Sequence, residues 1–221
     1  MLGEKKAVIF DLDGTLIDSM WVWSTVDEIY MEKYKIVKPD DFHEVMEGIS
    51  YTEVAQYFQD EFNLSLTVEE IKQEWLDMTI EMYRNEVQLK EGVQEFLASL
   101  RQQGIRLGIA TSSTRELVEA VLEGRGVRHY FDAICTSCEV NTGKPAPDVY
   151  LRVAEMLAVS PAECLVFEDV PKGVMAGKNA GMQVTAVEDE GNLSQRQQLR
   201  KLADYYISTY RDVLKNTYEV L

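Results

Sequence analysis

Five short apolar runs, each the length of a β-strand and each followed by a helical stretch, constrain the fold of this chain most strongly. The runs are Ala7 to Phe10, Ile105 to Ala110, Ala133 to Cys135, Cys164 to Phe167 and Gln183 to Val187. Continuous apolar strands that alternate with helices are typical of a parallel sheet covered on both faces. We therefore expect an α/β fold with a doubly wound parallel sheet. Ligands of such sheets bind beyond the carboxyl ends of the strands, so the residues that follow each run are the candidates for catalysis and ligand binding.

The stretch between Thr15 and Glu91 differs from the rest of the chain because it holds one glycine, Gly48, and one proline, Pro39. Such a stretch favours long helices and few tight turns. Apolar residues three or four apart predict two helices, with the stripes Met20, Trp23, Val26, Tyr30, Tyr34 and Val68, Ile71, Trp75, Met78, Met82. Capping boxes are expected at Ser50 with Glu53 and at Thr67 with Glu70. We expect residues 19–89 to form an inserted helical domain and residues 1–18 and 90–221 to form the sheet domain.

The charge and the composition exclude several classes of protein. Among 221 residues, 22 lysines and arginines face 38 aspartates and glutamates, giving a net charge of −16. Binding to nucleic acid is not expected, because it needs clustered basic side chains. No apolar stretch reaches the roughly 18 to 20 residues that span a bilayer, and no signal peptide is evident. We expect a cytoplasmic protein that does not bind membranes, whose three cysteines, Cys135, Cys138 and Cys164, are reduced thiols.

Two carboxylates, Asp11 and Asp13, follow the first apolar run. Residues two apart leave a strand on the same side, so both side chains can face one site. The D-x-D-G pattern alone also fits a turn with local capping. It does not fit a calcium loop, because the sixth position counted from Asp11 is Leu16 and the twelfth is Val22, where glycine and a carboxylate are required.

Three later strand ends carry further polar groups. Residues 111–114 are Thr-Ser-Ser-Thr before a helical stretch, Lys144 lies in a proline-stiffened loop, and Glu168 and Asp169 follow the fourth run. Each feature alone also fits a structural role, namely helix capping for the hydroxyls and acids and solvation for the lysine. Together with Asp11 and Asp13, these residues supply a nucleophile, an anion-binding site, a positive charge and metal ligands at one sheet edge. We adopt this joint interpretation.

In their order along the chain, these residues resemble the motifs of the haloacid dehalogenase superfamily of aspartate-nucleophile phosphotransferases. The matching segments are DLDGT at 11–15, IATSS around Thr111, GKPAPD at 143–148 and FEDVPKGVMAGKNAG at 167–181. The resemblance covers nearly the whole chain. The helical insertion after the first motif resembles the C1 cap of the family, and the subgroup resembles the one that contains β-phosphoglucomutase and small sugar-phosphate phosphatases. A Rossmannoid core with an inserted all-helical cap is thereby implied.

The resemblance also implies roles for the four acids. Asp11 would attack phosphorus and form an aspartyl-phosphate. Asp13 would protonate the leaving alcohol and later deprotonate the attacking water. Mg²⁺ would be held by the Asp11 carboxylate, the Asp13 backbone carbonyl and Asp169, with Glu168 as an outer or alternate ligand.

The phosphate-binding roles would fall to Thr111, the backbone of Ser112, and Lys144. These groups would bind the oxygens of the transferring phosphoryl group and neutralise charge that develops in the transition state. The expected partner is a small phosphorylated molecule, bound by a monomer.

Two activities of the subgroup remain open, phosphatase and sugar phosphomutase. The mutases carry a histidine ten residues after the acid/base aspartate and an arginine just past a glycine-x-serine of the cap. Trp23 and Tyr51 occupy these places, and neither grips a distant phosphate as arginine does. We therefore expect hydrolysis, most simply of a sugar phosphate. Trp23, Tyr51 and Met20 are candidates for lining the substrate pocket, although an aromatic stripe on a helix is also typical of a domain core.

Other classes fit less well. Dehalogenases of the superfamily act without metal and lack the second acid of the first motif, whereas Asp13 and Asp169 are present. A phosphorylatable receiver module uses similar residues on a doubly wound sheet but has no long helical insertion. A non-catalytic phosphate-binding protein on the same scaffold would not need the complete set of motif residues.

Overall fold

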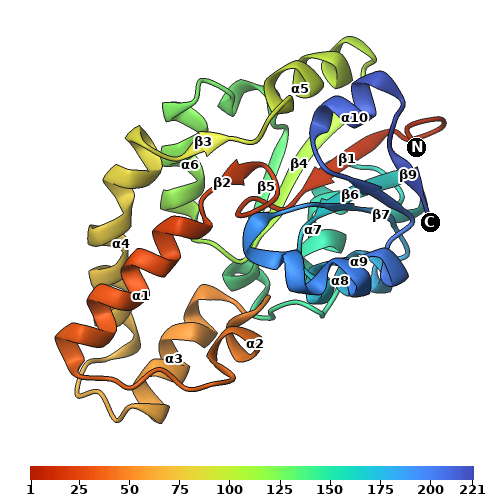
Figure 1. Cartoon of the computed structure of the whole chain (residues 1–221). Helices are drawn as coiled ribbons and strands as arrows, with labels where there is room; N and C mark the ends of the chain where they lie inside the picture. The colour runs from red at the N-terminus through yellow and green to blue at the C-terminus, as the bar shows by residue number, and fades with distance from the viewer.

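The computed structural model describes the backbone of residues 1–221 and every side chain except that of His43. Its core is a seven-stranded sheet in the order β5-β4-β1-β6-β7-β8-β9, in which only the pair β8 and β9 is antiparallel (Figure 1). The strands are β1 (Ala7–Phe10), β4 (Arg106–Thr111), β5 (Ala133–Thr136), β6 (Cys164–Glu168), β7 (Gln183–Val187), β8 (Tyr205–Ile207) and β9 (Glu219–Val220). The predicted doubly wound parallel sheet is confirmed.

Strand β1 lies inside the sheet, between β4 and β6, and is buried on both faces. Val8 and Phe10 belong to one apolar cluster, whereas Ala7 and Ile9 belong to another. Successive side chains of a strand point to opposite faces, so a strand between two helical layers has to be apolar throughout. This double burial is the physical reason for the continuous apolar run.

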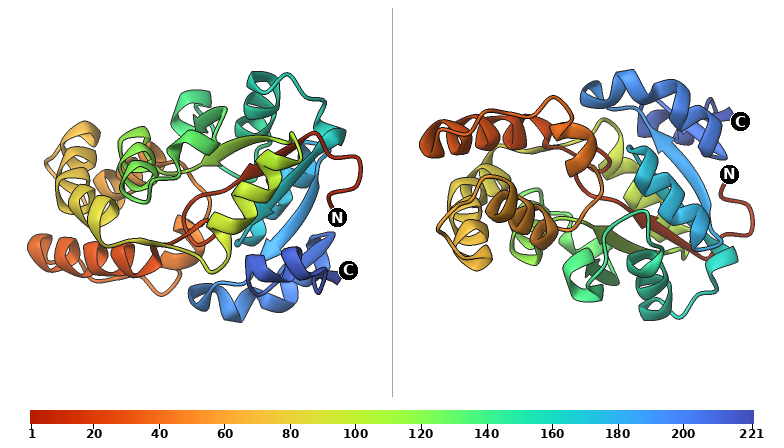
Figure 2. Two further views of the ribbon diagram at one scale, coloured as in Figure 1. Left: turned by 90° about the horizontal axis from the view of Figure 1, so that it is seen from above. Right: turned by 90° about the horizontal axis from the view of Figure 1, so that it is seen from below.

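Helices cover the two faces of the sheet (Figure 2). The cluster that contains Phe10 receives side chains from α5 (Val93–Gln102), α6 (Arg115–Gly124) and α10 (Tyr210–Lys215). The cluster that contains Ile9 receives side chains from α7 (Asp148–Met156), α8 (Pro171–Asn179) and α9 (Arg196–Leu202). The sheet is therefore closed above and below, and only its edges are left for a site.

Four helices are inserted after β1, between the strands β2 (Ile17–Asp18) and β3 (Gln88–Leu89). The helices are α1 (Met20–Tyr34), α2 (Phe42–Met46), α3 (Tyr51–Glu61) and α4 (Val68–Asn85). Because β2 and β3 pair antiparallel, the chain leaves and re-enters the sheet region through one short ribbon. The four helices lie on the side of the molecule opposite the two termini, and α4 packs along α6 (Figure 1).

The local predictions for this helical segment can be compared with the structure. Both capping boxes form, at the start of α3 and at the start of α4. The buried face of α4 repeats every fourth residue, through Ile71, Trp75, Thr79 and Tyr83. The predicted stripe shifts away from this face after Trp75, and Met78 and Met82 are only partly buried. The apolar pattern therefore located the helix but not all of its buried residues.

Other elements were not expected from the sequence. Helix α2 and the strands β2, β3, β8 and β9 each span five residues or fewer, which is too short for a periodic pattern. The three cysteines are free. Among the described residues, none of the helices is both long enough and apolar enough to span a bilayer.

Candidate active site

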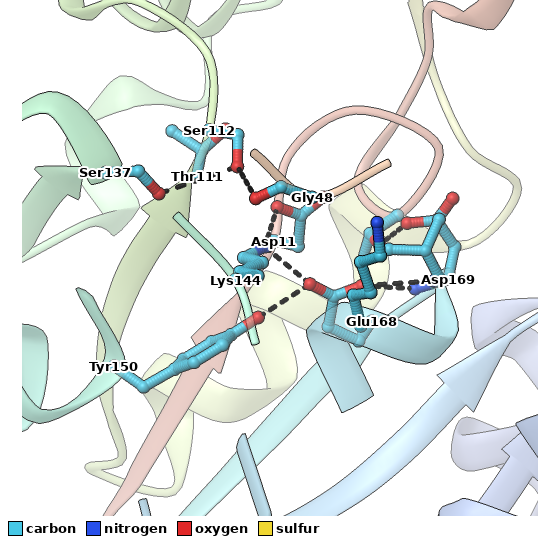
Figure 3. Close-up of polar contacts among 12 residues, drawn as sticks. Asp11, Gly48, Thr111, Ser112, Ser137, Lys144, Tyr150, Glu168 and Asp169 are labelled. Carbon is cyan, nitrogen blue, oxygen red and sulfur yellow. Dashed lines mark hydrogen bonds and ion pairs between the residues drawn. The ribbon is translucent and has the colours of Figure 1, made fainter. Parts of the chain in front are cut away.

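Asp11 lies directly after β1, at the carboxyl end of this inner strand. Its backbone N–H donates to the carbonyl oxygen of Phe167 on β6 at 3.0 Å, so the residue is still fixed to the sheet. Its Oδ1 accepts a hydrogen bond from the Lys144 Nζ at 2.6 Å (Figure 3). Within the part of the chain that the structure describes, Oδ2 accepts no hydrogen bond. Asp11 is thus held by one oxygen while the other remains available.

Two more acids lie beside Asp11: Glu168 is the last residue of β6, and Asp169 follows it. One oxygen from each of the three buried carboxylates lies within 4.8 Å of the others. Burial raises the pKa of Asp11 to about 8, with Lys144 opposing and Glu168 reinforcing the effect. Burial also raises the pKa of Asp169 well above its ordinary value, and the charges of Glu168 and Asp11 add to this. The raised pKa values of Asp11 and Asp169 reflect carboxylates whose charge Lys144 alone does not compensate, and such a set of oxygen ligands suits a hard divalent cation.

The orientation of Asp169 is set by its neighbours. The Thr15 hydroxyl donates to Asp169 Oδ1 at 2.8 Å, and the Asn192 Nδ2 donates to Oδ2 at 2.7 Å. Gly14 has a φ of +74°, and a Cβ at this position would lie 2.3 Å from Asp169 Oδ2. Glycine is therefore required at position 14 both by the backbone and by the close approach of the carboxylate.

Glu168 makes hydrogen bonds with both of its oxygens inside the protein. Oε1 accepts from the Lys144 Nζ at 2.5 Å and from the Tyr150 hydroxyl at 2.9 Å (Figure 3). Oε2 accepts from the backbone N–H groups of Asp169 at 2.9 Å and Val170 at 3.2 Å. This arrangement suits a residue that positions Lys144 and the loop after β6 rather than one that offers a vacant oxygen.

Lys144 is 3% exposed and bridges Asp11 and Glu168. Burial lowers the pKa of its ammonium group, but the carboxylates of Asp11 and Glu168 outweigh burial and raise the pKa above its ordinary value. The group is therefore positively charged at neutral pH. In a strongly acidic chain this one buried cation supplies the local positive charge of the site.

Thr111 and Ser112 approach the same place from the end of β4. The Thr111 Oγ1 accepts a hydrogen bond from the backbone N–H of Ser113 at 3.0 Å. The Ser112 hydroxyl donates to the carbonyl oxygen of Gly48 at 3.1 Å (Figure 3). The backbone N–H of Lys144 donates to the same oxygen at 2.9 Å. The loop before α3 is thus bonded directly to the residues that the sequence assigned to phosphate binding.

Asp13 lies at the start of the helical segment and receives hydrogen bonds from it. The Ser19 hydroxyl donates to Asp13 Oδ1 at 2.7 Å, and the Tyr83 hydroxyl of α4 donates to the same oxygen. Burial raises the pKa of Asp13, while hydrogen bonds from Ser19, Tyr83 and Trp23 offset part of the rise. A raised pKa is what a general acid requires, because the group has to carry a proton at working pH.

Tyr83 was missed by the sequence reasoning. It is fully buried on α4, four residues after Thr79 and eight after Trp75. Extending the spacing of four from Ile71 and Trp75 would have reached it. Burial and the neighbouring Asp13 raise the pKa of its hydroxyl well above the ordinary value, so Tyr83 is the proton donor in this hydrogen bond.

Replacing Tyr83 with phenylalanine is expected to lower kcat by about tenfold with little change in KM. A hydrogen bond typically contributes about 0.5 to 1.5 kcal/mol, and here it fixes the Asp13 carboxyl. The steady-state rate of turnover measures the effect. Tyr34→Phe is the matched control, because it removes a tyrosine hydrogen bond to a carboxylate, that of Glu74 at 2.8 Å, away from the site. Equal kcat values for Tyr83→Phe and the control would contradict a role for Tyr83 in positioning Asp13.

A cavity of about 500 Å³ lies between the sheet edge and the inserted helices. It is lined by the predicted residues Asp11, Asp13, Met20, Trp23, Tyr51, Thr111, Ser112, Lys144 and Asp169. Glu168 lies behind this surface and does not line the cavity. Residues at the sheet edge and residues of the inserted helices therefore line one cavity, with the acids and Lys144 at its base.

Further lining residues had not been singled out. Ser113 has a buried hydroxyl without a hydrogen-bond partner among the described residues, and Asn192 contacts Asp169. Lys38 also lines the cavity, from the loop before α2. Ser113 stands inside the segment 111–114, so its position was predictable. Asn192 and Lys38 carry no local signal, because they reach the site only through the packing of distant segments.

The fold and the site define a class: α/β proteins with buried acids and one lysine at the carboxyl edge of a parallel sheet, beneath inserted helices. The chain belongs to the haloacid dehalogenase-like hydrolase family, whose model matches residues 8–187. The resemblance inferred from the motifs is thus confirmed.

Individual relatives narrow the class. The chain is 34% identical over 209 residues to the probable pseudouridine-5'-phosphatase of Drosophila melanogaster, a match that covers 89% of this chain and 90% of the relative. It is 30% identical over 185 residues to the phosphorylated carbohydrates phosphatase of Thermotoga maritima, covering 80% and 82%. The β-phosphoglucomutase of Clostridium difficile has the same fold, with a TM-score of 0.79, 23% identity and coverage of 95% and 93%. The chain is a phosphoric monoester hydrolase of this family.

Proposed function

We propose that the chain is a magnesium-dependent phosphatase that hydrolyses a small phosphorylated metabolite, such as a sugar phosphate, through an aspartyl-phosphate. The observation that carries the proposal is the meeting of Asp11, Asp13 and Lys144 in the lining of one cavity. The substrates in the names of the two relatives, pseudouridine 5'-phosphate and phosphorylated carbohydrates, support a small organic phosphate ester.

In the first step an oxygen of Asp11 attacks phosphorus, and the bond from phosphorus to the alcohol oxygen breaks. Asp13 gives its proton to that oxygen, so the product leaves as a neutral alcohol. In the second step Asp13, now ionised, takes a proton from water, and this water attacks phosphorus. The bond from phosphorus to Asp11 breaks, inorganic phosphate leaves, and both residues return to their first states.

The residues present fit a magnesium ion. Asp11, Asp169 and the main-chain carbonyl of Asp13 would hold it, because Mg²⁺ prefers a few carboxylate or carbonyl oxygens and keeps several waters. When bound, the ion supplies positive charge to the phosphoryl oxygens. Glu168 would act from behind this set, since both of its oxygens already accept hydrogen bonds.

Lys144, Thr111 and the backbone of Ser112 would contact the other phosphoryl oxygens. Lys144 Nζ already lies 2.6 Å from Asp11 Oδ1, so it would neutralise charge next to the attacking atom. The hydroxyls and N–H groups at the end of β4 would orient the phosphoryl group. A fixed set of donors of this kind needs no rearrangement when charge develops.

The alternative, a sugar phosphomutase, has less support. A bisphosphorylated intermediate needs a second anion site in the helical part of the cavity. Among the described residues, Lys38 is the one cation that this part contributes to the lining, and its Nζ lies 4.0 Å from the Asp27 carboxylate. Trp23 and Tyr51 carry no positive charge where mutases have histidine and arginine. We therefore propose hydrolysis.

We propose that residues 19–89 act as the cap over a catalytic core of residues 1–18 and 90–221, and that the chain acts as a monomer in the cytoplasm. The net charge of −16 argues against nucleic acid as a partner.

Removal of the metal is expected to inactivate the enzyme reversibly. Treatment with EDTA should lower phosphate release by at least about 10²-fold, because the ion supplies several kcal/mol of charge stabilisation. Excess Mg²⁺ should restore the rate, and EDTA already saturated with Mg²⁺ is the control. Full activity after exhaustive chelation would overturn the metal assignment.

A further inference from the structure

The side chain of Asn192 has one partnered end and one unpartnered end, both inside the protein. The residue is 2% exposed and lines the cavity together with Asp11 and Asp169. Its Nδ2 donates to Asp169 Oδ2 at 2.7 Å. An ionised carboxylate accepts hydrogen bonds and donates none, so the amide nitrogen has to face Asp169 and the amide oxygen has to face elsewhere. That oxygen, Oδ1, is buried and receives no hydrogen bond from any described residue.

A buried acceptor of this kind indicates a donor that comes from outside the protein chain. Leaving a buried carbonyl oxygen without a donor is unfavourable, and native proteins contain few such atoms. In the proposed function Asp169 is a ligand of Mg²⁺, which retains several waters of its hydration shell when it binds to a protein. The positive ion polarises the O–H bonds of these waters and makes them strong hydrogen-bond donors. A water of the bound ion is therefore the kind of donor that Asn192 Oδ1 lacks.

The backbone that carries Asn192 is fixed by a short turn after β7. Asp189 Oδ1 accepts from the Gly191 N–H at 2.8 Å, and the Asn192 N–H donates to the Asp189 carbonyl oxygen at 3.1 Å. Asp189 Oδ2 also forms an ion pair with the Lys90 Nζ at 2.7 Å, and both side chains are largely buried. The turn is thus held by contacts independent of the acids of the site. A residue held in this way can support a metal ligand without rearrangement.

We propose that Asn192 is a positioning residue of the divalent-ion site, whose Nδ2 orients Asp169 and whose Oδ1 accepts a hydrogen bond from a water of the bound ion. This inference rests on the magnesium dependence of the proposed function. Thr15 donates to the other oxygen of Asp169 at 2.8 Å, so the two residues together fix both carboxylate oxygens. Asn192 would then set the affinity for the ion without contacting either the ion or the substrate phosphorus.

Calorimetric titration of the metal-free protein with Mg²⁺ measures this affinity without turnover. Asn192→Leu keeps nearly the same size but has neither a donor nor an acceptor, and we expect it to raise the Kd for Mg²⁺ by about 10- to 100-fold, the usual effect of losing an outer partner of a metal ligand. Asn192→Ala should shift Kd in the same direction, so the test does not depend on whether leucine packs. In turnover assays, the Mg²⁺ concentration for half the maximal rate should rise by a similar factor.

Asn85→Leu is the matched control. Its Nδ2 also donates to a carboxylate, that of Glu81 at 2.9 Å, but on the exposed end of α4. We expect this control to bind Mg²⁺ as the parent does. A residue with a structural role alone would lower the unfolding temperature of the metal-free protein and leave Kd in place. Parent-like Kd values in both Asn192 variants would therefore overturn the inference.

The contact between Oδ1 and water has its own measurement. Labelling with asparagine that carries ¹³Cγ and ¹⁵Nδ2 gives one side-chain resonance that is absent from Asn192→Leu, which assigns it. Saturation of the parent with Mg²⁺ should move the Asn192 ¹³Cγ resonance downfield, as expected for a carbonyl oxygen that gains a donor, while that of Asn85 stays. An unmoved Asn192 resonance at saturating Mg²⁺ would overturn the water contact.

The binding data also distinguish this inference from the proposed function. Tight Mg²⁺ binding by the parent and by both Asn192 variants would leave the magnesium-dependent phosphatase intact and remove the role of Asn192. Absence of Mg²⁺ binding to the parent by calorimetry, together with phosphate release that resists EDTA, would overturn both.

Discussion

Replacing Asp11 with asparagine is expected to remove measurable phosphatase activity, a loss on the order of 10⁵-fold or more. An amide is too weak a nucleophile to form the phosphorylated intermediate, although it keeps the shape of the carboxylate and an oxygen for Lys144. Because burial raises the pKa of Asp11 to about 8, the charged form is unfavourable in the folded, metal-free protein. We therefore expect the variant to unfold at a temperature no lower than the parent.

Phosphate release and thermal unfolding in metal-free buffer measure the two effects. Asp18→Asn is the matched control, since it makes the same change at an exposed carboxylate on β2. Rapid quenching of the parent, followed by mass spectrometry, should detect a phosphoryl group on the peptide that contains Asp11. Near-normal hydrolysis by Asp11→Asn would remove it as the nucleophile.

Replacing Asp13 with asparagine is expected to lower kcat for alkyl phosphates by about 10² to 10⁴-fold, the usual range for a general acid or base. With p-nitrophenyl phosphate the first step needs little protonation, because nitrophenolate is a good leaving group. The second step still needs a base to activate water. We therefore expect a rapid burst of nitrophenol, about equal to the enzyme present, followed by a slow steady state.

Stopped-flow absorbance measures the burst, and Asp40→Asn, at an exposed carboxylate, is the control. A steady-state rate equal to that of the parent with both kinds of ester would mean that another group moves the proton. Slow release without a burst would contradict a role confined to proton transfer.

The centre of the site was predictable because of how parallel sheets are built. Asp11 and Asp169 directly follow β1 and β6, Thr111 is the last residue of β4, and the carboxyl ends of parallel strands meet at one edge. Recognising apolar runs was therefore enough to bring residues 158 positions apart into one hypothesis, from Asp11 to Asp169. Lys144 follows no strand directly, and it was found through the resemblance and its proline-rich loop.

The surroundings of the site were less predictable. Tyr83 reaches Asp13 from the end of α4, 70 positions further along the chain, and Asn192 reaches Asp169 from a short 3₁₀ turn after β7. Such contacts depend on tertiary packing, which leaves no periodic trace in a single sequence. Trp23 and Tyr51 were predicted as lining residues, and both line the cavity while also packing into the core of the inserted helices.

Two residues without any functional group are as constrained as the acids they touch. At Gly14 an added methyl would lie 2.3 Å from an Asp169 oxygen, and at Gly173 it would lie 1.8 Å from a Glu168 oxygen. Even alanine would displace the carboxylates from the geometry that the reaction needs. In a saturation library selected for turnover, both positions would be depleted of every alternative, so mutational intolerance here would report steric exclusion and not chemistry.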